Sequence, residues 1–159
     1  MTYYTFTDTP AGTILLIGDG KKLNGIHWKS FERAPKVQSD WIEDPKMFSM
    51  HLKQLNEYFA GERTSFDFEF SAEGTDFQKK VWKELSKIPF GASKSYATIA
   101  RAIGKPKAVR AVGTAVGSNP MSIVVPCHRV LTSANKLGGF AGGIKSKQIL
   151  LKREGIGWR

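Results

Sequence analysis

The residues best suited to chemistry lie around the one cysteine of the chain, Cys127, which is followed directly by His128. A cysteine is a nucleophile only as a thiolate, and a nearby base or positive charge supplies that character. A lone cysteine after an apolar run is more often inert core filling. Residues 123–125 are such a run and predict a buried strand, in which neighbouring side chains point to opposite faces. A bridging water or a local turn is therefore needed to connect the sulfur with the imidazole.

Glu154 offers a third member of this group. It follows Leu150 and Leu151 by four and three residues, so the three side chains share one face of an expected C-terminal helix. A carboxylate drawn toward a core needs a hydrogen-bonding partner, and an imidazole gains basicity from such a pairing. The spacing leaves two interpretations open: a Cys/His/Glu relay, or a surface glutamate near a helix end.

The segments that must position these residues are mostly helical. Thr75 begins a capping-box pattern at the start of one expected helix, and Ser95 can cap another over residues 96–103. A tight turn at residues 104–106 precedes a third helix, expected over residues 107–116. Two short helices joined by a glycine-containing turn fit a helix-turn-helix, although many unrelated helix pairs share this pattern.

The second helix of this pair has two unlike faces. Val109, Val112 and Val116 form an expected buried stripe. The opposite side carries one long cation among small residues: Arg110, Ala111, Thr114, Ala115 and Gly117. Small side chains let a helix approach another surface closely while the arginine projects beyond them. An ordinary surface arginine is the alternative.

The first part of the chain predicts a small antiparallel sheet with one helix. Three segments rich in β-branched and aromatic residues are separated by turn signals: residues 2–6, 13–17 and 23–28. Asp44 predicts the start of a helix, and apolar residues at helical spacing follow over residues 48–59. Phenylalanines alternate with acidic residues over 66–70 and predict a half-buried strand. No group of residues in this part predicts chemistry.

The net charge of +10 is divided unevenly. Residues 1–70 carry 8 Lys and Arg against 10 Asp and Glu, whereas residues 71–159 carry 16 against 4. We therefore expect two domains in an α+β fold, an N-terminal part (residues 1–70) and a basic, mostly helical C-terminal part (residues 71–159). A basic module of this size favours a polyanion such as nucleic acid as partner, with a solubilising surface as the alternative.

Composition excludes several classes of protein. With 159 residues and 41% apolar side chains, the chain can bury a core. Its apolar runs are far too short to span a bilayer. One cysteine rules out an internal disulfide and a multi-cysteine zinc site. The polar and aromatic first residues predict no signal peptide, so we expect a cytoplasmic protein without membrane attachment.

Four segments together resemble one family. They read Gly-Ser-Asn-Pro at 117–120, Pro-Cys-His-Arg-Val at 126–130, Gly-Gly-Phe-Ala-Gly-Gly at 138–143 and Leu-Leu-Lys-Arg-Glu-Gly at 150–155. They are similar to the 6-O-alkylguanine-DNA alkyltransferases, the methylated-DNA–protein-cysteine methyltransferases of direct DNA repair. The resemblance is dense over residues 75–155. It extends to the preceding strand-and-helix pattern, which in this family is a ribonuclease-H-like domain without activity.

The resemblance implies irreversible, single-turnover transfer of the alkyl group from 6-O-alkylguanine in double-stranded DNA, with 4-O-methylthymine as a second candidate substrate. Cys127 would take the alkyl group as a thioether, His128 would act on it as a base through a water, and Glu154 would orient His128. Tyr96 matches the tyrosine that donates a hydrogen bond to N3 of the guanine. Arg110 matches the finger that fills the space left by the flipped nucleotide, with the small-residue face around it in the minor groove.

The remaining roles follow from the same resemblance. Asn119 would tie the helix-turn-helix to the active-site strand. The carbonyls of Cys127 and Val130 would hold the guanine amine, and the Ala141 amide would approach the alkylated oxygen. Phe140 and Ala141 stand where some members have tyrosine and serine, so hydroxyl contacts are lost there.

Some relatives also carry a structural zinc in the N-terminal domain. With Cys127 as the one cysteine and His27 and His51 as the other histidines, that site cannot form in its usual way, and we expect no metal and no cofactor. We expect a monomer in solution, and cooperativity on DNA stays open.

Two other classes of function compete with this interpretation. Alkyltransferase-like proteins bind alkylated DNA without chemistry and typically carry tryptophan at the nucleophile position, where this chain has Cys127. A cysteine hydrolase using Cys127 and His128 is the other alternative, but the sequence shows no sign of a substrate pocket for it.

Overall fold

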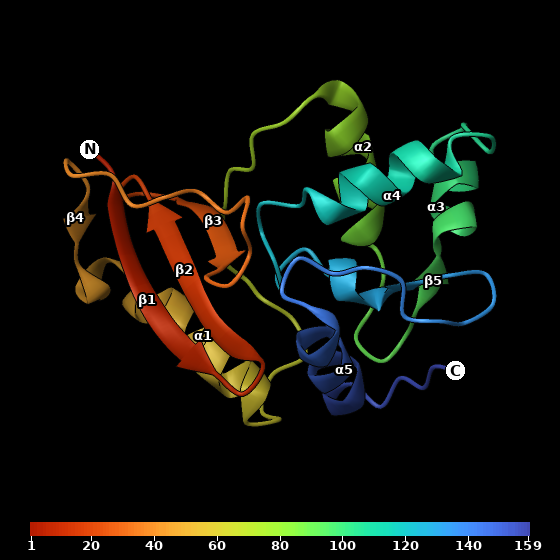
Figure 1. Cartoon of the computed structure of the whole chain (residues 1–159). Helices are drawn as coiled ribbons and strands as arrows, with labels where there is room; N and C mark the ends of the chain where they lie inside the picture. The colour runs from red at the N-terminus through yellow and green to blue at the C-terminus, as the bar shows by residue number, and fades with distance from the viewer.

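The computed structural model describes all 159 residues and shows two parts lying side by side (Figure 1). The N-terminal part holds β1 (Tyr3–Thr9), β2 (Gly12–Gly18), β3 (Leu23–Trp28), β4 (Ile42–Glu43), the 3-10 helix η1 (Pro45–Phe48) and α1 (Ser49–Phe59). The C-terminal part holds α2 (Asp76–Leu85), β5 (Lys94–Ser95), α3 (Tyr96–Ala102), α4 (Val109–Gly117), the 3-10 helix η2 (Cys127–Arg129), β6 (Val130–Leu131) and α5 (Ile144–Arg153). The fold is α+β, as predicted. None of its helices has the length and apolar character needed to span a membrane.

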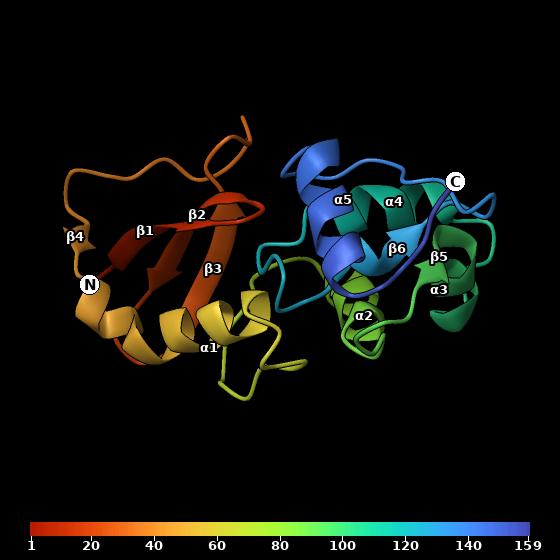
Figure 2. The ribbon, with the colours of Figure 1, turned by 90° about the horizontal axis from the view of Figure 1, so that it is seen from below.

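The N-terminal sheet has the strand order β3-β2-β1-β4. The first three strands form the predicted antiparallel meander, and β4 pairs parallel to β1. Side chains alternate across it, so Leu16 and Ile26 are fully buried in the main core. Helix α1 covers one face, while the connection from β3 to β4 runs along the other (Figure 2).

The predicted strand over residues 66–70 is wrong. Phe70 makes one isolated bridge to Leu23, and the rest of the segment is irregular, with a bend at Phe68. The physical reason lies at the edge of β3, where the Ile26 N–H donates to Pro120 O at 2.9 Å and the Ser122 N–H donates to Ile26 O at 3.2 Å. Because a segment of the C-terminal part occupies this edge, the phenylalanines pack on the core without joining the sheet.

One hydrophobic core runs through both parts of the molecule. Its buried members include Trp28 of β3, Leu55 of α1, Trp82 of α2 and Leu150 of α5. The two parts are therefore joined by shared apolar packing as well as by the backbone hydrogen bonds at the edge of β3.

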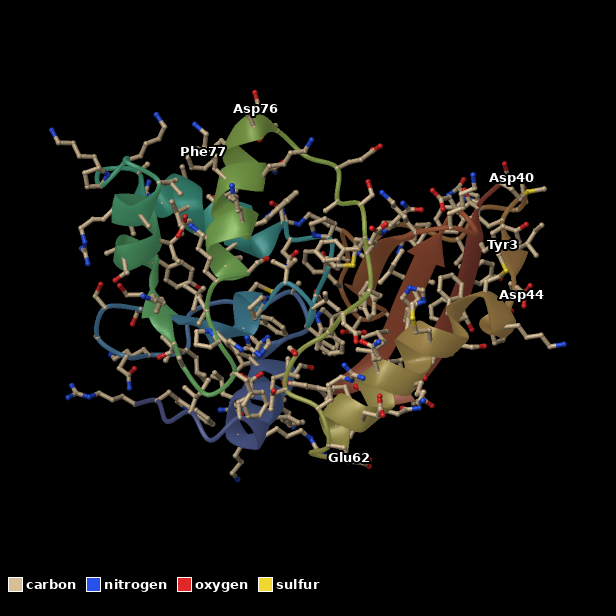
Figure 3. All side chains as sticks on the ribbon, turned by 180° about the vertical axis from the view of Figure 1, so that it is seen from behind. Tyr3, Asp40, Asp44, Glu62, Asp76 and Phe77 are labelled. Carbon is tan, nitrogen blue, oxygen red and sulfur yellow. The ribbon has the colours of Figure 1, made fainter.

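The predicted helix starts of the C-terminal part are confirmed at two caps. The Thr75 hydroxyl accepts from the Gln78 N–H at 3.1 Å, and the Gln78 side chain accepts from the Thr75 N–H at 2.9 Å, which completes the capping box. Asp76 and Phe77 form the first turn that follows (Figure 3). The Ser95 hydroxyl caps α3 by accepting from the Thr98 N–H at 3.0 Å.

Helix α4 differs from its prediction in three respects. It begins at Val109 and not at residue 107, because the turn from Gly104 to Ala108 continues through a hydrogen bond from the Ala108 N–H to Lys105 O. Val109 is 38% exposed, so only Val112 and Val116 of the predicted stripe are buried. Ala115, expected on the exposed side, is buried, because α2 packs there and the Trp82 indole donates to Ala115 O at 2.9 Å.

Candidate active site

A cavity of about 890 Å³ opens between the end of β3, helix α4 and the loop before α5. Its volume lies in the range of small-molecule sites, roughly 300–1,000 Å³. Many of the predicted site residues line it: Tyr96, Arg110, Thr114, Gly117, Asn119, Cys127, Phe140 and Ala141. The structure therefore brings Cys127, Tyr96 and Arg110 to one cavity. The side chains of His128, Glu154 and Val130 are buried and do not line it, and Ala111 is exposed outside it.

The chain reaches Cys127 through consecutive turns, so the predicted buried strand over residues 123–125 is wrong. Ile123 has a φ of 72°, and the Cys127 N–H donates to Val125 O at 2.8 Å. Asn119 holds this segment closed, because its side chain accepts from the Met121 N–H and donates to Val125 O, both at 2.9 Å. These bonds tie the end of α4 to the cysteine segment. Residues Cys127–Arg129 form the 3-10 turn η2, so a local turn, one of the two alternatives from the sequence for connecting the sulfur with the imidazole, is present here.

His128 and Glu154 form a buried pair. Glu154 follows the last residue of α5, and its Oε2 lies 2.6 Å from His128 Nε2, with both side chains fully buried. The alternative of a surface glutamate is therefore wrong. A carboxylate can only accept, so Nε2 carries the proton and Nδ1 keeps its lone pair. Nδ1 is buried and has no hydrogen-bond partner in the protein.

The charges of this pair are set by burial and by its donors. Burial lowers the pKa of His128, against the opposing pull of Glu154, so the imidazole is neutral. Burial by itself would raise the pKa of Glu154. Hydrogen bonds from His128, Arg129 and Tyr58 outweigh that effect and hold the pKa at about 2. The pair is thus a neutral imidazole hydrogen-bonded to a carboxylate anion.

Three further groups donate to Glu154. The Tyr58 hydroxyl reaches Oε2 at 2.6 Å, Arg129 Nε reaches Oε1 at 2.6 Å, and the Gly91 N–H reaches Oε1 at 3.3 Å. The sequence did not identify Tyr58 or Arg129 as site residues. Arg129 lies inside the cysteine motif and could have been noticed there, whereas no sequence signal marks Tyr58.

The Cys127 thiol lies in a mixed environment. It is 5% exposed, and its burial raises the pKa of the thiol. The Asn119 side chain and the positive charge of Lys147 act in the opposite direction. The resting cysteine is thus mainly a protonated thiol, and ionisation requires a base that takes its proton.

Lys147 is a third residue that the sequence analysis did not identify. Its side chain is fully buried, and Nζ donates to Val130 O at 2.7 Å and to the carbonyls of Leu137 and Gly139. No carboxylate neutralises it, and burial lowers its pKa to about 8. A lysine within the Lys-Ser-Lys run of α5 has the pattern of a surface residue, so the sequence gives no sign that Lys147 is buried against these carbonyls beside the cysteine.

Tyr96 stands at the first position of α3 and is half-buried. A Cβ added at Gly138 would lie 3.0 Å from the Tyr96 hydroxyl oxygen, and Gly138 has a φ of 68°. Only glycine therefore lets the loop before α5 come this close to the tyrosine. In the same loop, Phe140 packs edge-to-face on Trp28, with ring centroids 5.6 Å apart.

The N-terminal part contributes one wall of the cavity. His27, Trp28, Phe31 and Arg33 all line it, and the Arg33 guanidinium lies 5.3 Å from the centroid of the Phe31 ring. The sequence predicted no chemistry in this part and gave no sign that it contributes to the cavity wall. Elsewhere, no three His, Cys, Asp or Glu side chains come together in a way that could hold a metal ion.

Comparison with known proteins matches both parts of the chain to one family. Residues 2–72 match the 6-O-methylguanine DNA methyltransferase ribonuclease-like domain, and residues 76–156 match the DNA binding domain of the same family. The chain is 46% identical over 152 residues to the methylated-DNA–protein-cysteine methyltransferase of Methanosarcina barkeri, covering 96% of each. It is 47% identical over 154 residues to that of Mycobacterium tuberculosis strain H37Rv, covering 97% of this chain and 93% of the other.

Solved structures give the same picture. The crystal structure of Mycobacterium tuberculosis OGT in complex with DNA superimposes with a TM-score of 0.89 at 46% identity, covering 96% of this chain and 92% of that one. The methyltransferase of Pyrococcus kodakaraensis has a TM-score of 0.58 at 21% identity, covering 98% of this chain and 100% of that one, and shows the shared fold.

Glu154 predicts an acid-dependent loss of stability. Its pKa of about 2 in the folded protein lies below the unfolded value of about 4.3. Its stabilisation is therefore complete above about pH 4.3 and is lost as the pH falls through about 2, an effect on the order of 3 kcal/mol. The free energy of unfolding, measured with urea from about pH 6 down to about pH 2, should decline less for Glu154→Gln than for the wild type. The exposed Glu62→Gln is the matched control, and equal declines in all three proteins would refute the assignment.

Lys147 predicts a change in thiol reactivity. Replacing it with methionine removes the charge that opposes the burial effect, so the pKa of Cys127 should rise further and the reaction with iodoacetamide should slow about tenfold near neutral pH. The full pH profile is the measurement, because its midpoint reports ionisation separately from access to the cavity. Lys145→Met, at an exposed position of the same helix, is the control. A midpoint that is the same in Lys147→Met and the wild type would contradict this role.

Proposed function

The chain belongs to the 6-O-methylguanine DNA methyltransferase family and is a methylated-DNA–protein-cysteine methyltransferase of DNA alkyl repair, and we propose that it transfers the alkyl group of 6-O-alkylguanine irreversibly to Cys127, once per protein molecule. The observation that carries the proposal is the cysteine in the cavity wall, next in sequence to a neutral, buried histidine that Glu154 fixes with its Nδ1 unpartnered. Such an arrangement can accept a thiol proton.

The reaction begins with the thiol proton. It passes through a bridging water to Nδ1 of His128, and the imidazolium that forms is stabilised by the adjacent Glu154 carboxylate. The sulfur then attacks the alkyl carbon, a carbon–sulfur bond forms, and the carbon–oxygen bond breaks with its electrons passing to the guanine. A hydrogen bond from the Tyr96 hydroxyl to N3 disperses the charge that develops on the leaving base. A thioether is a poor leaving group, so Cys127 is not regenerated.

The guanine is held by backbone groups in this proposal. The carbonyls of Cys127 and Val130 accept from the exocyclic amine, and the Ala141 amide approaches the alkylated oxygen. Val130 O already accepts from Lys147, but a carbonyl oxygen has two lone pairs and can accept a second bond. Lys147 thereby fixes the carbonyl that the base would meet. Phe140, packed on Trp28, offers an apolar surface beside the base.

DNA binding is the role proposed for the α3–α4 pair, acting as a helix-turn-helix. The basic C-terminal part can contact phosphates without regard to sequence, and the related Mycobacterium tuberculosis protein has been crystallised with DNA.

Chemistry on a paired base requires extrusion of that base from the duplex, at a cost of a few kcal/mol. Arg110, exposed and at the cavity, would fill the space left in the duplex. The exposed small residues Ala111, Thr114 and Gly117 let α4 enter the minor groove. Ala115 is buried and has no part in this contact.

The proposal includes a boundary between two domains after residue 70, in the short polar stretch of residues 71–75. The two matched family segments end at residue 72 and begin at residue 76, which supports a boundary in this short polar stretch. The cysteine at the nucleophile position supports a transferase over a protein that only binds alkylated DNA.

Mass spectrometry tests the single-turnover transfer. After incubation with an oligonucleotide carrying one 6-O-methylguanine, the peptide that contains Cys127 should gain the mass of one CH₂ group, and methyl loss from DNA should stop at one equivalent of protein. Cys127→Ser should show neither change. Repair of many lesions per molecule, or repair by the serine variant, would overturn the proposal and favour a hydrolase.

Arg110→Ala separates the extrusion of the base from the chemistry. Because the arginine acts only when a nucleotide leaves the duplex, its loss should slow repair of double-stranded DNA about tenfold or more, while reaction with free 6-O-benzylguanine stays close to the wild-type rate. Arg101→Ala, an exposed arginine of α3, serves as the comparison. The same slowing on both substrates would argue against a role in flipping.

A further inference from the structure

Helix α1 of the N-terminal part reaches the relay directly. Tyr58, in its last turn, is 3% exposed, and its hydroxyl donates to Glu154 Oε2 at 2.6 Å. The same oxygen lies 2.6 Å from His128 Nε2. The tyrosine and the imidazole therefore share one carboxylate oxygen, although they come from opposite parts of the chain.

The surroundings of Tyr58 fix its ring. Phe59, Phe66 and Phe90 contact it with ring centroids 5.1, 5.7 and 6.2 Å away, all but Phe66 in edge-to-face geometry. The neighbouring residues reinforce the contact. Arg153, just before Glu154, donates to the carbonyl of Phe59, just after Tyr58, and its guanidinium lies 5.5 Å from the centroid of the Phe59 ring. The end of α1 and the end of α5 are thus joined at two successive residues.

We propose that Tyr58 is a positioning residue for alkyl transfer, which acts through Glu154 on His128 and makes α1 part of the catalytic apparatus. The proposal rests on the proposed function. A hydroxyl fixed on Oε2 limits where that oxygen can lie and so sets the orientation of the imidazole. It also draws negative charge away from the oxygen that His128 contacts, so the imidazole stays neutral and its Nδ1 can accept a proton.

Besides Tyr58 of α1, the ionisable groups around His128 and Glu154 come from two segments. Arg129 of η2 donates to both oxygens of Glu154, and Lys147 and Arg153 of α5 are the other cations near the pair. Burial raises the pKa of Tyr58, with Glu154 acting in the same direction, so the tyrosine donates at every working pH. Loss of its hydroxyl leaves the carboxylate more basic, which favours protonation of His128.

Tyr58→Phe tests the proposal, because it removes one oxygen and keeps the packed ring. At saturating methylated DNA, the single-turnover rate constant should fall about tenfold, the effect of a lost hydrogen bond to a charged group. The acid limb of the pH–rate profile should move to higher pH, while DNA affinity stays unchanged. Tyr4→Phe, on the sheet face away from α1, is the matched control and should follow the wild type.

Two measurements separate positioning from simple destabilisation. In the first, each rate is normalised to the fraction of active protein, which is determined by titration. In the second, nitrogen NMR of the His128 imidazole follows its protonation directly in the free protein. The titration of His128 should move to higher pH in Tyr58→Phe. In a Glu154→Gln background, the tyrosine substitution should add little, because the partner through which it acts has changed.

An unchanged rate and an unchanged His128 titration in Tyr58→Phe would overturn the proposal. A rate that falls only with the active fraction, with the acid limb in place, would also overturn it and assign Tyr58 to stability alone. Absence of transfer by the wild type would instead refute the proposed function, and the NMR titration would still decide whether Tyr58 controls His128.

Discussion

The structure depends on one buried carboxylate. Glu154 accepts hydrogen bonds from α1, from η2 and from the turn before β5, and it stands at the end of α5. Removing a carboxylate from water costs several kcal/mol, which only donors at good geometry offset. The requirement to satisfy this anion therefore fixes four separate segments relative to one another. Displacement of any one of them would leave a buried charge with too few partners.

The Glu154 anion also affects the protonation of His128 and Cys127. A carboxylate held as an anion keeps the Nε2 proton of His128 in place, so the free lone pair on Nδ1 is on the side that does not face Glu154. The thiol meanwhile stays protonated by burial, with the Lys147 charge as a partial counterweight. Oxidants attack a thiolate more readily than a thiol, so the protonated resting state is less open to oxidation. Burial therefore lowers the reactivity of the resting cysteine, while the neutral imidazole keeps a lone pair that can accept its proton.

Sequence patterns predicted what depends on neighbours along the chain. The meander, the caps at Thr75 and Ser95, and the grouping of Cys127, His128 and Glu154 all follow from local spacing or from motifs that resemble one family. The errors arise where distant segments compete. Residues 66–70 have strand character, but residues 120–122 occupy the edge they would need. Ala115 resembles its exposed neighbours, yet α2 packs on it. Lys147 and Tyr58 acquire their roles from contacts that no local pattern contains.

The contribution of the N-terminal part also depends on contacts between distant segments. Its sequence contains no chemical motif, but β3 and α1 hold the catalytic segment from two sides. The edge of β3 pairs with residues 120–122, just before the turns that lead to Cys127. Helix α1 holds Glu154, which orients the histidine that follows the cysteine. Cys127 and His128 are adjacent in sequence, so their relative placement requires both the backbone before Cys127 and the partner of His128 to be fixed. The N-terminal part contributes to each of these two constraints, through the edge of β3 and through Tyr58 of α1.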